Sequence, residues 1–170
     1  KTEQGILDLV DNNFSPCILR MSTLHGLSPR MRFDLVANTF AMQASTGKKI
    51  QIFGGEQWRP MLHVNDAADA YIKCLEVPIN LIKGQVFNVG SENENYQIIQ
   101  LGKITKEILP ETEINIIENE IIEGNVDKRD YKVSFKKIRD ILKFNPIMTV
   151  RESMIEIKNS IEIGQFKDVN

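Results

Sequence analysis

The sequence predicts an α/β protein, and two features of its apolar pattern carry this prediction. Short apolar runs of the kind found in buried strands recur along the chain. Longer segments between them repeat their apolar residues about every three to four positions, as amphipathic helices do. Strands that alternate with helices are typical of the α/β class. The expected strands are few and the expected helices many, so we expect part of a sheet together with a helical lobe.

Glycine and proline mark the element boundaries in the first part of the chain. Pro16 separates the first expected helix from the first strand, and Gly26 and Pro29 mark the loop that follows this strand. Gly47 ends the next helix, as a glycine after a helix commonly does. The elements expected here, in order, are a helix at 2–12, a strand at 17–22, a helix at 33–46 and strands at 50–53 and 61–64.

Capping residues mark the boundaries in the second part of the chain. Asn65 or Asp66 is expected to cap the helix that begins near residue 67, and Ser134 and Thr149 are expected to cap the last two helices. Pro110 ends the helix before the last strand. The elements expected here are helices at 67–75, 98–109, 134–142 and 150–163, strands at 85–89 and 114–117, and an irregular charged stretch at 121–132.

Composition argues against several classes of function. The chain has 170 residues and a formal net charge of −2, which argues against non-specific binding of nucleic acid. No apolar run approaches the roughly 20 residues that span a membrane. Cys17 and Cys74 lie in apolar settings and are expected to be reduced core residues, so the expected location is cytoplasmic. With two histidines and two well-separated cysteines, no metal site of the usual ligand spacing can be drawn.

The stretch 53–66 carries the clearest chemistry. Two consecutive glycines permit the positive φ angles of a sharp turn, and an apolar run follows a few residues later. Between the glycines and this run, Arg59 can present its forked guanidinium to phosphate or carboxylate oxygens. The alternative for Arg59 is a solvated loop residue or an ion pair with Glu56. Trp58 beside it either stacks on a base or anchors the loop.

Several motifs together resemble one known family. In chain order they are Leu19-Arg20-Met21-Ser22-Thr23-Leu24-His25-Gly26-Leu27-Ser28-Pro29, the stretch 54–66, Phe87-Asn88-Val89-Gly90, Asp127-Lys128-Arg129-Asp130-Tyr131, Lys137-Ile138 and Leu142-Lys143-Phe144-Asn145-Pro146. In order and spacing they resemble the extended short-chain dehydrogenase/reductase family. More narrowly, they resemble the carboxy-terminal half of its NAD-dependent nucleotide-sugar epimerases and dehydratases. The resemblance extends from about residue 1 to about residue 160.

The resemblance implies a division of the chain. Residues 1–30, with returning strands and helices near 60–90, are expected to be the carboxy-terminal part of a Rossmann-type parallel sheet. Residues 31–59 and 91–165 are expected to form a small mixed α/β substrate-binding lobe. The family's phosphate-cradling glycine motif and its catalytic Tyr and Lys are not found in this sequence. We therefore expect a piece of a longer chain, with the cofactor-binding half and the catalytic pair upstream; Lys1 is a weaker candidate for that Lys.

The resemblance also implies site residues. Ser22 and Thr23 are expected to contact NAD or NADP. The residues expected to bind the substrate, a nucleoside-diphosphate sugar, are Thr23, Arg32, Asn38, Arg59 and Arg129. Simpler roles remain for some of them, such as a turn hydroxyl for Thr23 and a solvated charge run for Arg129. His25 stands where many relatives carry a Tyr, and His63 is expected to be a satisfied core residue.

The function that the resemblance implies is substrate binding within an NAD(P)-dependent nucleotide-sugar epimerase or dehydratase. Such an enzyme acts through a transient keto-sugar and is expected to be a homodimer. One alternative is a non-catalytic binding module that keeps this lobe. Another is an NADPH-dependent reductase of a non-sugar carbonyl. Arg59 and Arg129 argue against the reductase, because a neutral substrate has no use for two cations.

Overall fold

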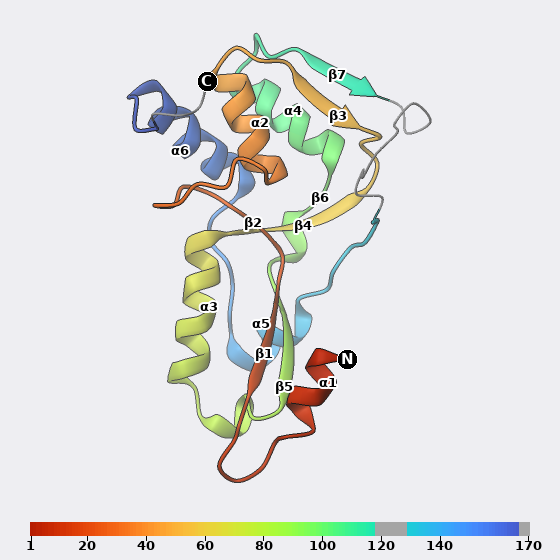
Figure 1. Ribbon diagram of the computed structural model, residues 1–170, viewed down its shortest axis with the longest axis vertical. Coiled ribbons are helices and arrows are strands. Elements are labelled where there is room, and N and C mark those ends of the chain that lie inside the picture. The colour runs from red at the N-terminus through yellow and green to blue at the C-terminus, as the bar shows by residue number, and fades with distance from the viewer. Residues whose placement is uncertain (118–128, 167–170) are drawn as a thin grey trace.

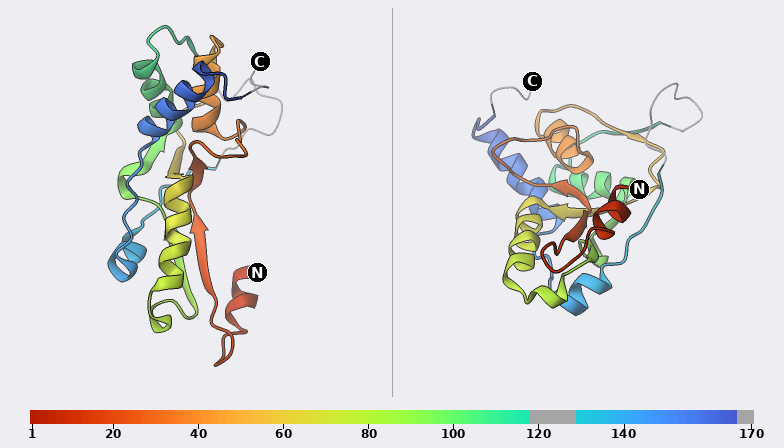
Figure 2. Two further views of the ribbon diagram at one scale, coloured as in Figure 1. Left: turned by 90° about the vertical axis from the view of Figure 1, so that its left-hand side faces the viewer. Right: turned by 60° about the horizontal axis from the view of Figure 1, so that its bottom comes forward.

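The computed structural model describes residues 1–117 and 129–166, which form an elongated molecule (Figure 1). Their buried apolar side chains gather in two clusters, one in the upper and one in the lower part of Figure 1. A small three-stranded sheet lies between these clusters (Figures 1 and 2). Helices alternate with strands, and three of the strand pairs are parallel. This is the α/β class that the sequence predicts.

The lower core is built on a parallel pair of strands. These are β1 (Cys17–Met21) and β5 (Gln85–Val89). Helices α3 (Val64–Glu76) and α5 (Lys136–Leu142) pack their apolar residues against this pair. The buried members of this core are Leu62, Ala67, Ala70, Cys74, Phe87, Val89, Phe135, Ile138, Leu142 and Phe144.

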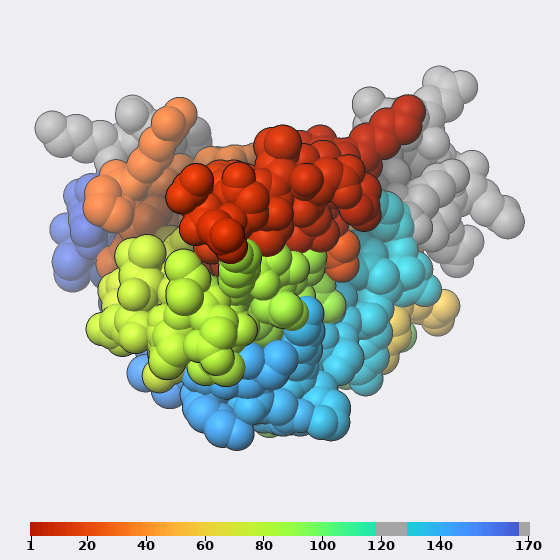
Figure 3. Space-filling model, turned by 90° about the horizontal axis from the view of Figure 1, so that it is seen from below, coloured from red at the N-terminus to blue at the C-terminus, as the bar shows by residue number. Residues whose placement is uncertain are grey.

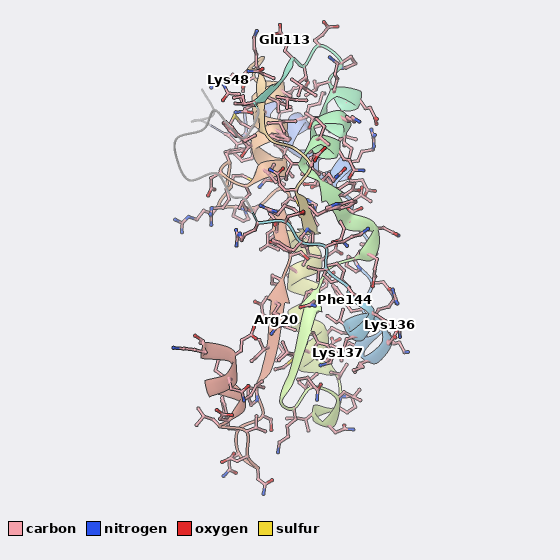
Figure 4. All side chains as sticks on the ribbon, turned by 90° about the vertical axis from the view of Figure 1, so that its right-hand side faces the viewer. Arg20, Lys48, Glu113, Lys136, Lys137 and Phe144 are labelled. Carbon is pink, nitrogen blue, oxygen red and sulfur yellow. The ribbon has the colours of Figure 1, made fainter. Side chains whose placement is uncertain are left out.

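Two hydrogen bonds to backbone carbonyls join neighbouring segments in the lower part of the molecule. Lys137 of α5 donates from Nζ to the carbonyl oxygen of Val86 at 2.8 Å, and its place beside β5 is visible in Figure 4. The amino-terminal segment lies against the segment that follows α3, where the Gly84 N–H donates to the Pro16 carbonyl at 2.8 Å (Figure 3). The start of the chain is thereby fixed to the strand pair of the lower core.

The middle sheet contains β2 (Thr23–His25), β4 (Trp58–His63) and β6 (Asn95–Gln97). Strand β2 runs parallel to the end of β4, and β6 is antiparallel to its beginning. A single residue, Ser22, separates β1 from β2. The chain therefore passes directly from the lower sheet into the middle one.

The upper core surrounds a second parallel pair, β3 (Ile50–Phe53) and β7 (Ile114–Ile117). Helices α2 (Val36–Ser45), α4 (Ile98–Ile108) and α6 (Val150–Glu162) pack around it and against one another. The buried members of this core are Ala37, Phe40, Ala41, Ile50, Ile52, Met61, Ile98, Leu101, Val150, Met154 and Ile157.

Most of the predicted strands are confirmed. Strands β3, β5 and β7 match their predicted bounds, and β1 ends one residue before the predicted bound of 22. Strand β4 begins at Trp58 rather than at residue 61. Strands β2 and β6 were not predicted, because each has three residues and is too short to show alternation. At the start of α6 the predicted cap is confirmed, since Thr149 and Glu152 form a capping box.

Several helix ends differ from the prediction, and α3, for example, begins at residue 64 rather than 67. Helix α1 (Thr2–Leu7) ends well before residue 12, because the Asp11 carboxylate accepts two later backbone N–H groups and forms a turn. Helix α2 begins at residue 36 rather than 33, and the Thr39 hydroxyl donates to a backbone carbonyl of the preceding turn at 2.6 Å. Helix α5 has Phe135 rather than the predicted Ser134 at its N-cap position, although the Ser134 hydroxyl accepts the N–H of Lys136, the first residue of the helix, at 3.4 Å.

The predicted cap of α3 is also wrong. His63, rather than Asn65 or Asp66, caps this helix, because its Nδ1 accepts the Asn65 N–H at 3.1 Å. A neutral imidazole that accepts at Nδ1 carries its proton on Nε2. This Nε2 lies 3.2 Å from the Glu156 carboxylate on α6. His63 is therefore a satisfied buried residue, as predicted, and it links the corner between β4 and α3 to the upper core.

Asp66 forms a second link across this corner. Its carboxylate is 2% exposed and accepts the N–H groups of Ile147 and Met148 at 3.1 and 3.0 Å. These N–H groups lie just before α6, so one carboxylate fixes the approach of α6 to the start of α3. Its place in the first turn of α3 also suits a negative charge, because the helix N-terminus is electropositive.

His25, the last residue of β2, is buried against His63. It is 1% exposed, and the two ring centroids are 5.6 Å apart at an interplanar angle of 78°. Neither ring nitrogen of His25 has a hydrogen-bond partner among the described residues. Burial, with a smaller effect of His63, lowers the pKa of His25 to about 3. Gly26 follows with φ of 105°, and a Cβ there would lie 2.2 Å from His63 Nε2, so this position requires glycine.

Replacing Asp66 by Ala should lower the free energy of unfolding by about 2–4 kcal/mol, because two buried N–H groups lose a charged acceptor. Urea unfolding would measure this loss. Asp69→Ala is the matched control, since Asp69 lies on the same helix and is exposed. Equal midpoints for the two variants would show that the Asp66 contacts do not hold α6 in place.

The buried His25 should make stability depend on pH. Its folded pKa, about 3, lies below the ordinary value of 6.5, so below that ordinary value the unfolded chain binds a proton that the folded chain does not. The contribution of neutral His25 to the free energy of unfolding is complete above pH 6.5, and it is lost as the pH falls toward 3. Between pH 7 and 5 the loss is about 2 kcal/mol. Urea unfolding should show that the free energy of unfolding of His25→Phe falls less between pH 7 and 5 than that of the unmodified protein, by this amount. Parallel pH profiles for the two proteins would rule out a neutral buried His25.

Candidate functional site

The residues that the sequence assigns to a site lie around the middle sheet. Thr23 opens β2 directly beyond the carboxyl end of β1, the edge at which ligands of parallel α/β sheets gather. It is half-buried and stands opposite Met61 of β4. Ser22 is buried, and its hydroxyl donates to the Val89 carbonyl at 2.7 Å. A Cβ on Gly90 would lie 2.6 Å from this hydroxyl oxygen, so Ser22 is closely enclosed.

Arg32 is exposed and forms a bidentate pair with Asp34. Nε and Nη2 donate to the two carboxylate oxygens at 2.8 and 2.7 Å. The guanidinium lowers the pKa of Asp34 to about 2, chiefly through these hydrogen bonds. Both side chains are more than half exposed, where such a pair contributes little to stability. Arg32 can therefore exchange this carboxylate for another anion.

Asn38 is buried in the first turn of α2, and its amide bonds to the loop that precedes this helix. Its Oδ1 accepts the Gly26 N–H at 3.0 Å, and its Nδ2 donates to the Arg32 carbonyl at 3.1 Å. One amide thus holds both ends of the loop 26–32. This is a structural role that the sequence did not indicate, and ligand contact by Asn38 stays a prediction.

Arg59 is buried in β4 at 6% exposure, although the sequence places it in a loop before the strand. Its Nη1 donates to the carbonyl of Trp58 at 2.8 Å and to the carbonyl of Arg129. Its Cζ lies 5.3 Å from the ring centroid of Tyr131. The glycine-turn stretch and the segment that contains Arg129 therefore meet at Arg59. The side chain of Arg129 itself is exposed.

Residues 129–135, here called the closing segment, follow the middle sheet. Asp130 accepts the Trp58 N–H at 2.9 Å, and the Lys132 ammonium lies 4.5 Å from the Trp58 ring centroid. Val133 and Asn95 exchange two hydrogen bonds, at 3.0 and 3.1 Å. Trp58 is thus an anchor for the closing segment, which is one of the two roles that the sequence allows it.

The sequence did not identify Asp130, Tyr131 and Lys132 as contacts of β4. They belong to the stretch 121–132, which was expected to be irregular and charged, and residues 118–128 lie outside the described part of the chain. That undescribed range includes Asp127 and Lys128 of the motif around Arg129. Residues 129–132 have no helix or strand, as expected. An aromatic residue within this charged run was the one signal that could have indicated packing.

A buried carboxylate, that of Glu94, lies directly before strand β6 of the middle sheet. Glu94 accepts the Val150 N–H at the start of α6 and the Tyr96 hydroxyl, each at 3.0 Å. Burial raises the pKa of Glu94, because the charged form loses its hydration. Burial, together with this carboxylate, also raises the pKa of Tyr96. The pair fixes the start of α6 next to β6.

Within residues 1–117 and 129–166, no cluster of His, Cys, Asp or Glu side chains could hold a metal ion. Cys17 and Cys74 are both free thiols, and burial raises the pKa of Cys17 to about 12. No helix of the described ranges is both long and apolar enough to cross a membrane.

Solved structures resemble this chain over nearly its whole length. A dTDP-glucose 4,6-dehydratase from Bacillus anthracis, solved in complex with NAD, matches 89% of this chain with 47% of its own, at 22% identity and a TM-score of 0.71. A UDP-glucuronic acid 4-epimerase from Bacillus cereus, solved with UDP-glucuronic acid and NAD, matches 89% of this chain with 46% of its own, at 23% identity and a TM-score of 0.72. RMD from Pseudomonas aeruginosa, solved with NADPH, matches 95% of this chain with 53% of its own, at 20% identity and a TM-score of 0.74.

These likenesses confirm the predicted Rossmann-type α/β class, and at such identities they show the fold alone. The chain spans about half the length of the solved structures that it matches. Its sequence also matches a family model, NAD dependent epimerase/dehydratase family, over residues 5–90. This match covers more than half of the 170 residues, so the resemblance read from the motifs is confirmed. The chain belongs to the NAD dependent epimerase/dehydratase family.

Proposed function

We propose that this chain is the substrate-binding portion of an NAD(P)-dependent nucleotide-sugar epimerase or dehydratase that acts through a transient keto-sugar. The observation that supports it best is the meeting of Arg59 with the closing segment that carries Arg129. The family match supports the reaction class. Two of the similar structures are named for enzymes of dTDP-glucose and UDP-glucuronic acid, both nucleoside-diphosphate sugars.

Arg59 and Arg129 are the proposed ligands of the substrate diphosphate. A diphosphate offers several charged oxygens, and a guanidinium binds two of them at once through its parallel N–H groups. Arg32 is a third proposed contact, because its exposed partner Asp34 is readily exchanged. Thr23 and Asn38 are proposed to contact the substrate from β2 and α2. Diphosphate binding away from the reacting carbon can hold the sugar in place for reaction.

The cofactor is proposed to be NAD or NADP, which accepts and returns a hydride when bound. The residues around β1 fit one end of it. Thr23 presents a half-buried hydroxyl beyond the carboxyl end of a parallel strand. The Ser22 hydroxyl donates a hydrogen bond to the Val89 carbonyl, so its oxygen can still accept a hydrogen bond from an amide group. The phosphate-cradling glycine motif is not in this sequence. We assign no catalytic residue within the chain and place the family's Tyr–Lys pair outside it.

Four further features of the whole protein remain predictions. These are a homodimer, a cytoplasmic location, no binding to nucleic acid and no association with a membrane. The division into residues 1–30 with 60–90 and residues 31–59 with 91–165 also remains a prediction. Residues 135–144 pack in the lower core, with the strands of the first part.

Replacing Arg59 by Ala in the full-length protein should weaken the binding of a nucleoside diphosphate by about 1–3 kcal/mol, the scale of a lost charged hydrogen bond. Titration calorimetry with UDP and dTDP would measure the dissociation constants. Arg59→Lys should be intermediate, because it keeps the charge and loses the fork.

Arg151→Ala is the control for this measurement, since Arg151 is exposed on α6 and paired with Glu107. It should bind both nucleotides as the unmodified protein does. Unchanged affinity in Arg59→Ala would remove Arg59 from the site. Binding by the unmodified protein without NAD-dependent turnover would favour the non-catalytic module, and indifference to nucleoside diphosphates would favour a reductase of a neutral carbonyl.

A further inference from the structure

A buried amide, that of Asn95, fixes the backbone of the closing segment at Val133. Asn95 is 7% exposed and is the first residue of β6. Its Oδ1 accepts the Val133 N–H at 3.0 Å, and its Nδ2 donates to the Val133 carbonyl at 3.1 Å. Two residues of paired antiparallel strands exchange the same two bonds. The Asn95 side chain thus holds the backbone at Val133 as a neighbouring strand would.

This pattern of bonds depends on the amide group. An Asn side chain carries an acceptor oxygen and two N–H donors side by side. The Asn95 Nδ2 also donates to the Glu92 carbonyl at 3.2 Å, in the turn before β6, so the amide is held from both sides. A carboxylate of the same shape would keep the bond from the Val133 N–H and lose both donated bonds. Asp at this position would therefore weaken the hold on Val133 with little change in the volume of the side chain.

The other end of the closing segment is bound to β4. The Asp130 carboxylate accepts the Trp58 N–H at 2.9 Å, and the Arg129 carbonyl accepts from Arg59 Nη1. Strands β4 and β6 pair with each other in the middle sheet. The backbone that carries the Arg129 side chain is therefore fixed, relative to Arg59, by two strands of one sheet.

We propose that Asn95 is a positioning residue of the diphosphate site and that it acts through Arg129. Its bonds to Val133 fix the closing segment, so that the Arg129 side chain starts from a set place beside Arg59. This inference rests on the proposed function, because it needs Arg129 to bind the diphosphate. Asn95 itself does not touch the ligand.

A fixed backbone matters for an anion that is bound by two guanidinium groups. The oxygens of a diphosphate lie at set distances from one another, and each guanidinium binds them through N–H groups of fixed direction. A segment that moves has to be ordered when the ligand binds, and this ordering reduces the affinity. The Asn95 amide lowers that cost, because Val133 is already held in the ligand-free fold.

A double-mutant cycle tests this proposal. In the full-length protein, Asn95→Ala should weaken the binding of UDP and of dTDP about three- to tenfold, the scale of coupling within one hydrogen-bonded network. Asn95→Asp should lie between Asn95→Ala and the unmodified protein, because it keeps one of the two bonds to Val133. In an Arg129→Ala background, Asn95→Ala should change the affinity by less than about twofold, because the side chain that it positions is gone.

Asn93→Ala is the matched control, since Asn93 lies in the same turn and is exposed. It should bind both nucleotides as the unmodified protein does. If Asn95→Ala does not fold, Asn95→Asp takes its place in the cycle. The proposal is wrong if the Asn95 variant binds as tightly as the unmodified protein. Equal losses with and without the Arg129 side chain would also overturn it, because a general loosening of the fold does not depend on that side chain.

A second measurement needs no nucleotide. Hydrogen exchange followed by mass analysis of peptides would give the exchange rate of the closing segment. This rate should rise in Asn95→Ala and Asn95→Asp and stay unchanged in Asn93→Ala, with thermal unfolding used to check that each variant is folded. An unchanged rate in the Asn95 variants would show that Asn95 does not hold the segment. If the rate rises but the unmodified protein binds no nucleoside diphosphate, the proposed function fails and the positioning role with it, while the contact with Val133 remains a feature of the fold.

Discussion

Strand β4 contributes side chains to both apolar cores. Because side chains alternate along a strand, Met61 joins the upper core and Leu62 joins the lower core. A strand enclosed on both faces tolerates polar side chains only where they are hydrogen-bonded. His63 meets this condition through Asn65 and Glu156. Arg59 lies in the same strand, so its contacts with the closing segment belong to the fold as well as to the candidate site.

The candidate site therefore depends on contacts between distant parts of the chain. The closing segment reaches β4 through Asp130 and β6 through Val133. It also reaches the turn before β6 through Phe135, whose N–H donates to Glu92 at 3.0 Å. A substitution that removes any of these hydrogen bonds is expected to alter the position of the closing segment and, with it, of the Arg59 side chain. The residues proposed to bind the diphosphate are accordingly held by the same bonds that join the upper and lower parts of the molecule.

Local patterns predicted much of the fold. Apolar runs bounded by glycine or charge predicted β3, β5 and β7, and Thr149 as a cap predicted the start of α6. The cap of α3 was missed because a histidine ring nitrogen is not among the usual capping groups. Within the site, Arg59 stood out from its neighbours. Tyr131, whose ring lies beside it, did not, because the contacts between β4 and the closing segment join residues 70 or more positions apart.

The lysine beside β5 has a consequence for how molecules of this protein meet. Among the described residues β5 is paired with β1 alone. An unpaired strand edge can form hydrogen bonds with an extended segment of another molecule. Lys137 occupies the Val86 carbonyl on this strand with a charged ammonium. An incoming backbone would have to displace that ammonium before it could bond to this carbonyl. One side chain thus occupies a hydrogen-bonding position that an added strand would use.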